Sequence, residues 1–393
     1  MNVLHTDFHQ GWGGQAARVL MVCTELQRRG HRMKIAAPEG ELARRAREAG
    51  VAVDDHFAFR PPARALSFAK DVRRLGRLLR EDAVDVLHTH GSQDTWVGAS
   101  ARALTGLPAV FVATRHNTKP VRFNAANRWL YGRAIDHLLL VSESVRERFE
   151  PFLRAGLLAD DRISVVHSAY RVDLFRDGVD PEPLRRELGL AGRGPILGVL
   201  ARLVEDKGHT YLLQAFSRVR ALHPGAVLLV AGRGPLEPRL REEAASRGLG
   251  DSVRFLGFRD DVAEITGLLD VAVLPSVGCD ASSASIKEAM AMGRPVVATE
   301  VGGAREILDD GATGVVVPPA DPEALAAAIL ALLSDPGRSR RMGDRAREEV
   351  RRRFGPVQLA DGELAVYESL LRSRARAGSP AAAPFAGAGR GRS

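Results

Sequence analysis

Short apolar runs alternate with amphipathic stretches along most of the chain, and the alternation restarts near the middle. Strands alternating with helical patterns predict parallel sheets that are covered by helices on both faces. We therefore expect an α/β protein with two doubly wound, Rossmann-like domains that face an interdomain cleft. The strand-like runs lie at 2–6, 32–38, 51–55, 84–90, 108–114, 136–142 and 162–168, then at 195–203, 226–232, 252–258, 271–276, 295–300 and 314–319.

The length of 393 residues suits two domains better than one. Asp, Pro and Gly cluster between Tyr170 and Gly194, which predicts the boundary there. We expect an N-terminal domain over 1–172, a C-terminal domain over 190–354 and a further helix over 355–373. The remaining segment, 374–393, is made mostly of Ala, Gly, Pro, Arg and Ser, and its composition predicts a disordered tail.

Composition excludes several functional classes. The net charge of +8 comes mainly from arginines, aromatic residues are few, and no nucleic-acid-binding motif is present, so no nucleic-acid partner is expected. Two separated cysteines, Cys23 and Cys279, suit a reducing compartment. The first residues lack the pattern of a signal peptide, and no apolar run is long enough to span a bilayer. These features predict a cytoplasmic protein.

The loop after the run at 195–203 carries a basic pair. Arg202 follows the strand, and Lys207 with Gly208 precedes a helical pattern. A lysine near a helix N-terminus is repelled by the positive end of the helix dipole. An anion bound between the lysine and the helix end would remove this repulsion. Arg202 and Lys207 could then bind a phosphate. A solvated loop with a glycine turn explains the same residues equally well.

Two glycine-rich loops also follow predicted strands. Gly11, Gly13 and Gly14 precede the first long helix, and their backbone N–H groups could face an anion or a sugar. Gly232 and Gly234 precede Pro235 in the second half, where a tight turn is the simpler interpretation. Neither loop is a G-x-G-x-x-G or a G-x-x-x-x-G-K-[ST] motif, which argues against a dinucleotide oxidoreductase and a P-loop NTPase.

Histidines occupy two loops of the first half. His88, His90 and Asp94 follow one strand, and His116 follows another between Arg115 and Asn117. Both loops should point into the cleft, although a single histidine is more often structural than catalytic. No H-E-x-x-H or C-x-x-C motif is present, so no metal site is expected.

Two acids flank the start of a helix in "LPSVGCDASSASIKEAMAMGRPVVATEVGG". Ser285 and Glu288 match a capping box, and Asp280 suits a turn. The same helix start could equally bind a phosphate through its free N–H groups, with a carboxylate accepting a pair of sugar hydroxyls. From these residues alone the two interpretations are tied.

The order of these motifs over roughly 195–320 resembles that of the retaining family 4 glycosyltransferases, which have the GT-B fold. That family has an arginine after the first strand of its second domain, then a K-G pair, a G-x-G-P turn, and E-x7-E followed by E-A-M-A-x-G-x-P-V and G-G. The matching residues here are Arg202, Lys207 and Gly208, Gly232 to Pro235, and Asp280 to Gly303. "WGGQ" together with "CDASSASIKEAMA" also resembles bacterial transferases that build lipopolysaccharide or other envelope glycans.

The resemblance implies roles for the matching residues. Arg202 and Lys207 would neutralise a donor diphosphate and the charge on the leaving group. Glu288 would hold ribose hydroxyls, and Asp280 would contact the donor sugar. The backbone around Ala281, Ser282 and Ser283 would face the sugar and the β-phosphate. Gly13 and Gly14 belong to the predicted donor site, and His116 is the first-domain candidate for the reacting centre.

The resemblance also implies a metal-independent reaction without cofactors, with a nucleotide-sugar as donor and a glycan, lipid-linked or small-molecule acceptor. The family usually has Glu at the position of Asp280, so the reach of the acid differs here. Two alternatives follow: a non-catalytic protein that binds nucleotide-sugars, or another GT-B enzyme such as an epimerase. A phosphorylase would need a pyridoxal lysine, for which no motif is present.

The basic stretch 63–82 suggests one more partner. Leu66, Leu75, Leu78 and Leu79 alternate with basic residues in a helical pattern. Such a helix could rest on an anionic membrane, which would make the protein peripheral on the inner face of the membrane. An ordinary surface helix of an arginine-rich protein explains the pattern equally well.

Overall fold

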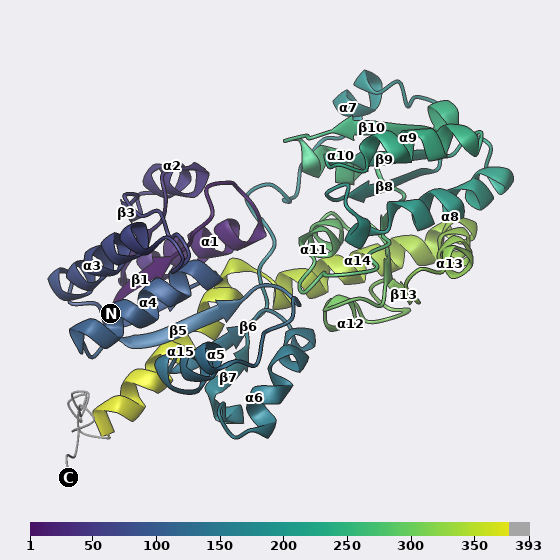
Figure 1. Cartoon of the computed structure of the whole chain (residues 1–393). Helices are drawn as coiled ribbons and strands as arrows, with labels where there is room; N and C mark the ends of the chain where they lie inside the picture. Colours follow the sequence, from purple (N-terminus) through teal and green to yellow (C-terminus); the bar gives the residue numbers. More distant parts are fainter. Residues whose placement is uncertain (377–393) are drawn as a thin grey trace, which may run out of the picture.

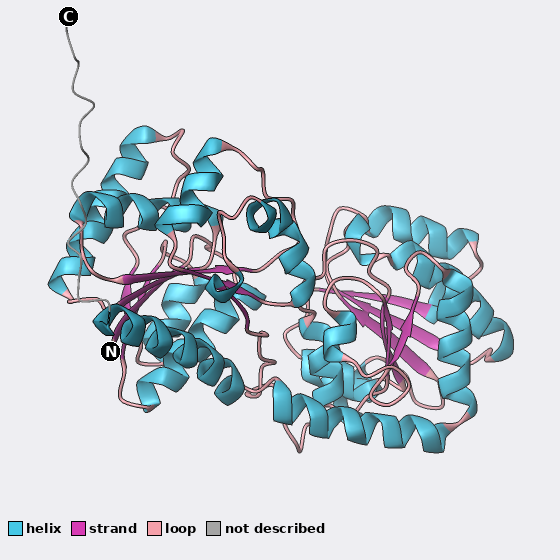
Figure 2. Cartoon of the chain, turned by 90° about the horizontal axis from the view of Figure 1, so that it is seen from below, coloured by secondary structure: helices cyan, strands magenta, loops and turns pink. Residues whose placement is uncertain are grey.

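A computed structural model describes residues 1–376 and shows two α/β units side by side (Figure 1). Each unit contains one sheet in which every strand pair is parallel, and helices cover both faces of each sheet (Figure 2). The predicted fold class is therefore confirmed. The tail predicted beyond residue 376 lies outside the described residues, whereas Arg374 and Arg376, assigned to that tail, end a helix instead.

The first sheet has seven strands in the order β3-β2-β1-β4-β5-β6-β7. Its strands are β1 (Asn2–Thr6), β2 (Arg32–Ala36), β3 (Ala52–Asp54), β4 (Val86–Thr89), β5 (Val110–Arg115), β6 (His137–Leu140) and β7 (Ile163–Val165). The helices of this part of the chain are α1 (Gly14–Arg28), α2 (Glu41–Glu48), α3 (Ala65–Glu81), α4 (Ser92–Thr105), α5 (Ala125–Trp129) and α6 (Glu150–Arg154).

The second sheet has six strands in the order β10-β9-β8-β11-β12-β13. Its strands are β8 (Ile196–Leu200), β9 (Val227–Ala231), β10 (Val253–Gly257), β11 (Val271–Leu274), β12 (Val296–Thr299) and β13 (Val315–Val317). The helices are α7 (Glu182–Glu187), α8 (His209–Leu222), α9 (Glu237–Ser246), α10 (Val262–Leu268), α11 (Ala284–Ala291), α12 (Ala304–Ile307), α13 (Pro322–Ser334) and α14 (Pro336–Arg353).

The strand order places the predicted loops together. In each sheet the first strand in the sequence lies between the second and the fourth, so the order reverses at β1/β4 and at β8/β11. Loops at such a switch point border the crevice in which doubly wound proteins bind ligands. The loops after β1 and β4 carry the glycines and histidines, and the loops after β8 and β11 carry Arg202 and Asp280.

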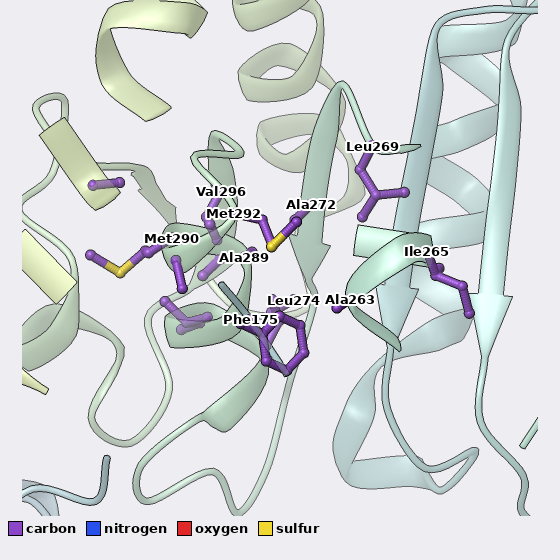
Figure 3. Close-up of a cluster of buried hydrophobic side chains, with 14 of the residues drawn as sticks. Phe175, Ala263, Ile265, Leu269, Ala272, Leu274, Ala289, Met290, Met292 and Val296 are labelled. Carbon is purple, nitrogen blue, oxygen red and sulfur yellow. The ribbon is translucent and has the colours of Figure 1, made fainter. Parts of the chain in front are cut away.

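The segment that links the two units packs into the apolar core of the second unit. Phe175 packs with Leu274 and Met292 in the cluster of Figure 3, and Leu184 of α7 belongs to the same cluster. The stretch after Tyr170, where the boundary was predicted, therefore packs onto the second sheet before β8 begins.

The last helix, α15 (Pro356–Arg376), returns to the first unit (Figure 1). It packs along α1, and Leu359, Ala360 and Tyr367 join the core beneath the first sheet. An ion pair joins the two helices, in which Arg18 Nη2 donates to Glu363 Oε1 at 2.7 Å and both side chains are 0% exposed. Arg18 also donates to the backbone oxygen of Val166, so its charge is fully partnered.

The basic helix α3 does not present its apolar face to a membrane. Leu75, Leu78 and Leu79 are buried in the core, where α3 packs against α4. Of the four leucines in the predicted membrane face, only Leu66 is exposed, at 91%. No helix among the described residues is long and apolar enough to cross a bilayer.

We expect Arg18→Met to lower the free energy of unfolding by about 3–5 kcal/mol, because it leaves the buried Glu363 carboxylate without its partner. Tryptophan fluorescence during denaturation checks this, since Trp12, Trp96 and Trp129 all lie in the first unit. Asp361→Asn is the matched control. It breaks a contact between α15 and Arg29, the residue that follows α1, in which the Asp361 side chain is 58% exposed, so it should cost less than about 1 kcal/mol. Equal costs would contradict the prediction.

Candidate functional site

A cavity of about 950 Å³ lies between the carboxyl ends of the two sheets. Gly13, Gly14 and His116 line it from the first unit, and Arg202 and Glu288 line it from the second. Ser282, which was also predicted, lines the same space. The structure therefore brings six predicted site residues from both halves of the chain to one cavity.

The glycines after β1 leave one wall of the cavity open. A Cβ added to Gly13 or Gly14 would meet no atom within 4 Å, so packing within the protein does not require glycine here. Gly13 stands at the N-cap of α1 in an extended conformation. The absence of side chains allows a ligand to approach the backbone closely at this helix start.

Arg202 extends into the cavity from the loop after β8. Its side chain is exposed and makes no hydrogen bond or ion pair with the part of the chain that the structure describes. A free guanidinium facing a cavity can bind a carboxylate or phosphate through two parallel hydrogen bonds.

Gly232 and Gly234 support this loop and do not line the cavity. A Cβ on Gly232 would lie 2.0 Å from the backbone oxygen of Ala201, and one on Gly234 would lie 2.2 Å from that of Leu203. Both glycines are therefore explained by the close approach of two backbones on either side of Arg202. Gly208 is similar: its φ is +63°, and its Cβ would lie 1.9 Å from the oxygen of Pro275.

Lys207 and Asp280 form an ion pair with each other. Lys207 Nζ donates to Asp280 Oδ2 at 2.8 Å, and Ser276 Oγ donates to the same oxygen at 3.1 Å. The anion expected beside Lys207 is thus a carboxylate of the protein. Neither residue is among those lining the cavity, in contrast to the positions expected for Lys207 at the donor diphosphate and for Asp280 at the donor sugar.

The backbone at 281–283 belongs to the second unit and lies against the first unit before α11 begins. Ala281 packs with the core of the first unit, whereas Ser282 faces the cavity. The glycine pair that follows β12 supports this segment. A Cβ on Gly302 would lie 2.0 Å from the oxygen of Asp280, and Gly303 N donates to that oxygen at 3.3 Å.

The predicted capping box at the start of α11 is wrong. Ser283 stands at the N-cap without a side-chain cap, and Ser285 Oγ donates to the backbone oxygen of Leu200 at 2.7 Å. Glu288 is therefore free of a capping role. It accepts a hydrogen bond from Arg171 Nε at 3.0 Å, and burial raises the pKa of its carboxyl despite the nearby charge of Arg171.

Lys287 is a cavity residue that the sequence analysis missed. Its side chain is 0% exposed, and Nζ donates to the backbone oxygen of Ser168 and to Ser282 Oγ, both at 2.7 Å. Burial, together with the nearby charge of Arg18, lowers the pKa of Lys287 to about 7. The only signal in the sequence was a lysine next to Glu288 on a helix whose neighbours are apolar.

The histidine loops lie deeper than expected. His88, His90 and Asp94 are buried, and of these only His90 reaches the cavity. Asp94 Oδ2 accepts from the backbone of His90 at 2.9 Å, and burial raises the pKa of Asp94 to about 7. His116, which lines the cavity, lies with Nε2 3.1 Å from His90 Nδ1.

The pKa of Lys287 predicts a pH-dependent stability. Above pH 7 the folded chain has released a proton that the unfolded lysine retains up to about pH 10.5, so the free energy of unfolding should rise with pH in this window. Between pH 7 and 9 we expect wild type to gain roughly 2 kcal/mol relative to Lys287→Met. Denaturation followed by circular dichroism checks this, with exposed Lys70→Met as control. Parallel pH curves for wild type and Lys287→Met would refute the assignment.

Two family models match the chain in succession. Residues 12–174 match the model described as Glycosyltransferase Family 4, and residues 180–349 match that described as Glycosyl transferases group 1. The two matches cover the first and second units, respectively.

Relatives and solved structures agree with the family models. The phosphatidyl-myo-inositol mannosyltransferase of Mycobacterium leprae is 30% identical over 92% of this chain and 94% of its own length. The GDP-mannose-dependent alpha-(1-6)-phosphatidylinositol monomannoside mannosyltransferase of Mycolicibacterium smegmatis is 29% identical over 87% and 91%. A Rickettsia africae glycosyltransferase has a TM-score of 0.84 at 22% identity, covering 94% of this chain and 98% of its own. The chain therefore belongs to the family 4 glycosyltransferases and has the GT-B fold.

Proposed function

We propose that this protein transfers a sugar from a nucleotide-diphosphate sugar to an acceptor hydroxyl with retention of configuration. The observation that carries the proposal is the cavity itself, which combines Arg202 and the acid Glu288 of one unit with Gly13, Gly14 and His116 of the other. A donor bound against the second unit would present its sugar to an acceptor held by the first.

The second-unit wall has the chemistry of a diphosphate and ribose site. Arg202 can hold the phosphates as a planar fork, and the start of α11 adds the positive end of a helix dipole. The backbone N–H groups of residues 281–283 have no hydrogen-bond acceptor within the described chain, so they can donate hydrogen bonds to a bound nucleotide-sugar. Glu288 can accept from both ribose hydroxyls. These basic and amide groups support a donor site without a metal ion or another cofactor.

Asp280 and Lys207 would act together as a pair. Their ion pair lies beneath the segment whose amides face the donor, since Asp280 directly precedes residues 281–283. Binding of a diphosphate would draw Lys207 toward the phosphates and free the Asp280 carboxylate for a sugar hydroxyl. The short side chain of Asp280 is thus compatible with the role that Glu has in the family, provided that the pair opens.

Retention and the acceptor are supported by the relatives. The Mycolicibacterium enzyme's name specifies GDP-mannose and an alpha-linked product, and retention is the stereochemical course from an α-linked nucleotide-sugar to an α-linked product. We propose a bacterial envelope glycan, of lipopolysaccharide or a related type, as the product. The acceptor would be a glycan, a lipid-linked sugar or a small molecule.

The proposed location is the cytoplasm, where the free thiols of Cys23 and Cys279 would stay reduced. With the leucines of α3 buried, contact with an anionic inner-membrane surface would depend on the basic residues of that helix and not on an apolar face.

We expect the purified chain to be stabilised against heat by a UDP- or GDP-sugar and to release nucleotide from it, because a ligand that binds the native state raises its stability. Arg202→Ala and Glu288→Ala should each weaken donor binding about 10- to 100-fold, or about 1.4–2.8 kcal/mol. Arg239→Ala, an exposed arginine of α9, is the control and should leave binding unchanged. Proton NMR of the product should show retention at the anomeric carbon.

Other outcomes would identify the alternatives. Donor binding without hydrolysis or transfer, tested with a range of acceptors, would indicate a non-catalytic binding protein. Conversion of one nucleotide-sugar to its epimer would indicate an epimerase. Unchanged affinity of both variants would refute the site.

A further inference from the structure

A chain of histidines runs from the cavity into the first unit and ends at α15. His116 Nε2 lies 3.1 Å from His90 Nδ1, and His90 Nε2 lies 2.8 Å from His5 Nδ1. His5 Nε2 in turn lies 3.4 Å from the hydroxyl of Tyr367. The three imidazoles come from the ends of β5, β4 and β1, so neighbouring strands of the parallel sheet align them.

The far end of the chain is held by an ionised carboxylate. Tyr367 OH donates to Glu363 Oε2 at 2.9 Å, while Glu363 Oε1 accepts from Arg18 Nη2 at 2.7 Å and from Nε at 3.1 Å. Burial opposes ionisation of Glu363, but the adjacent charge of Arg18 outweighs it and holds the pKa of the carboxyl well below its usual range. Glu363 is therefore an acceptor only.

The Glu363 carboxylate determines which atom donates in each hydrogen bond along the row of histidines. The single proton of Tyr367 goes to Glu363, so the phenol oxygen must accept from its other neighbours, which are His5 Nε2 and, at 2.5 Å, His88 Nδ1. His5 consequently carries its proton on Nε2. We assign these protons from the donors and acceptors that each atom faces.

The remaining rings each have one proton to place. Burial lowers the pKa of His5 to about 3 and lowers those of His90 and His116 well below their usual value, so all three are neutral at pH 7. His5 Nδ1 then accepts from His90 Nε2–H, and His90 Nδ1 accepts from His116 Nε2–H. His116 Nδ1 is left without a proton and without a partner in the described chain.

We propose that Glu363 and Tyr367 are positioning residues, which fix His116 in the tautomer that presents an unprotonated Nδ1 to the cavity. The site then offers a hydrogen-bond acceptor at this point, and the substrate group that it selects is a hydroxyl, not a carbonyl or phosphate oxygen. That the hydroxyl belongs to the donor sugar or the acceptor rests on the proposed function. The tautomer itself does not.

A metal site is the competing explanation for part of this cluster. One nitrogen each of His5, His88 and His90 lie within 4.8 Å of one another. However, every ring nitrogen of these three residues already faces a hydrogen-bond partner, including His88 Nε2, which lies 2.6 Å from Thr114 Oγ1. The hydrogen-bonded chain accounts for the cluster without leaving a lone pair for an ion.

His116 is neutral at pH 7, so it keeps one proton, on Nε2, and can accept a hydrogen bond through Nδ1. The groups whose charges act on the His116 pKa include Arg18 of α1, His88 of β4, His9 in the loop after β1 and Glu363 of α15, and His90 contacts the ring directly. Of these, only Glu363 favours the charged imidazole, and burial outweighs it.

The test reads the tautomer directly in the ligand-free, full-length protein. Long-range proton–nitrogen NMR on ¹⁵N-labelled protein distinguishes a protonated from an unprotonated ring nitrogen, and loss of signals in His116→Gln assigns them. We expect the wild type to show His116 with its proton on Nε2. Tyr367→Phe should add a population with the proton on Nδ1, because it removes the oxygen that accepts from His5 Nε2. Glu363→Gln should do the same, because the one remaining acceptor oxygen can serve Arg18 while the new NH2 group faces Tyr367 and donates to it.

Two comparisons make the result decisive. Thr114→Val removes a buried hydrogen bond to His88 that lies off the path to His116, so the His116 tautomer should not change. Glu363→Gln also breaks the pair with Arg18, so if it fails to fold, Tyr367→Phe, which keeps that pair, decides alone. A wild-type His116 protonated on Nδ1 or on both nitrogens, or an unchanged tautomer in Tyr367→Phe, would overturn the proposal. Because no donor is present, failure of donor turnover would leave this result standing.

Discussion

A sheet in which all strands run parallel must deliver every strand's carboxyl end to one edge, and this constraint shapes the whole molecule. In each unit the loops that carry chemistry leave from that edge, next to the strands where the order reverses. The two units turn these edges toward the same cavity. Arg202 and His116 are therefore brought together by sheet topology, although they belong to separate cores.

The two units are held in this arrangement by polar contacts around the cavity. Glu306 of α12 accepts from the backbone N–H groups of Glu143 and Ser144 at 2.8 and 3.1 Å. Lys287 reaches the backbone oxygen of Ser168, and Arg171 pairs with Glu288. Such contacts are fewer and more polar than those of a core, which suits units that move relative to each other when a ligand enters or leaves.

Periodicity predicted the strands and the fold class because alternation of strand and helix is local information. The motifs likewise located Arg202 and Glu288. The predictions that failed concerned which groups the side chains contact. Ser285 and Glu288 have the spacing of a capping box, yet the Ser285 hydroxyl bonds to Leu200, 85 residues earlier in the chain. Lys287 was missed because its burial depends on Ser168 of the other unit.

The histidine chain was beyond sequence reasoning for the same reason. His5 and Tyr367 are 362 positions apart, and no spacing rule connects them. The predictions made for the glycines were partly right. Gly13 and Gly14 were expected to admit a ligand and do line the cavity, whereas Gly232 proved to be required by the backbone of Ala201.

The placement of α15 also affects how the protein is made on the ribosome. The first unit cannot complete its core as it emerges, because Arg18 becomes buried beside a carboxylate that is translated 345 residues later. At typical synthesis rates of about 5–20 residues per second, this delay is roughly 20–70 seconds. During that time the groove for α15 on α1 is unfilled and its apolar residues are exposed to water. The nascent chain thus has a long interval in which chaperones, or other nascent chains, can bind the first unit before its own last helix does.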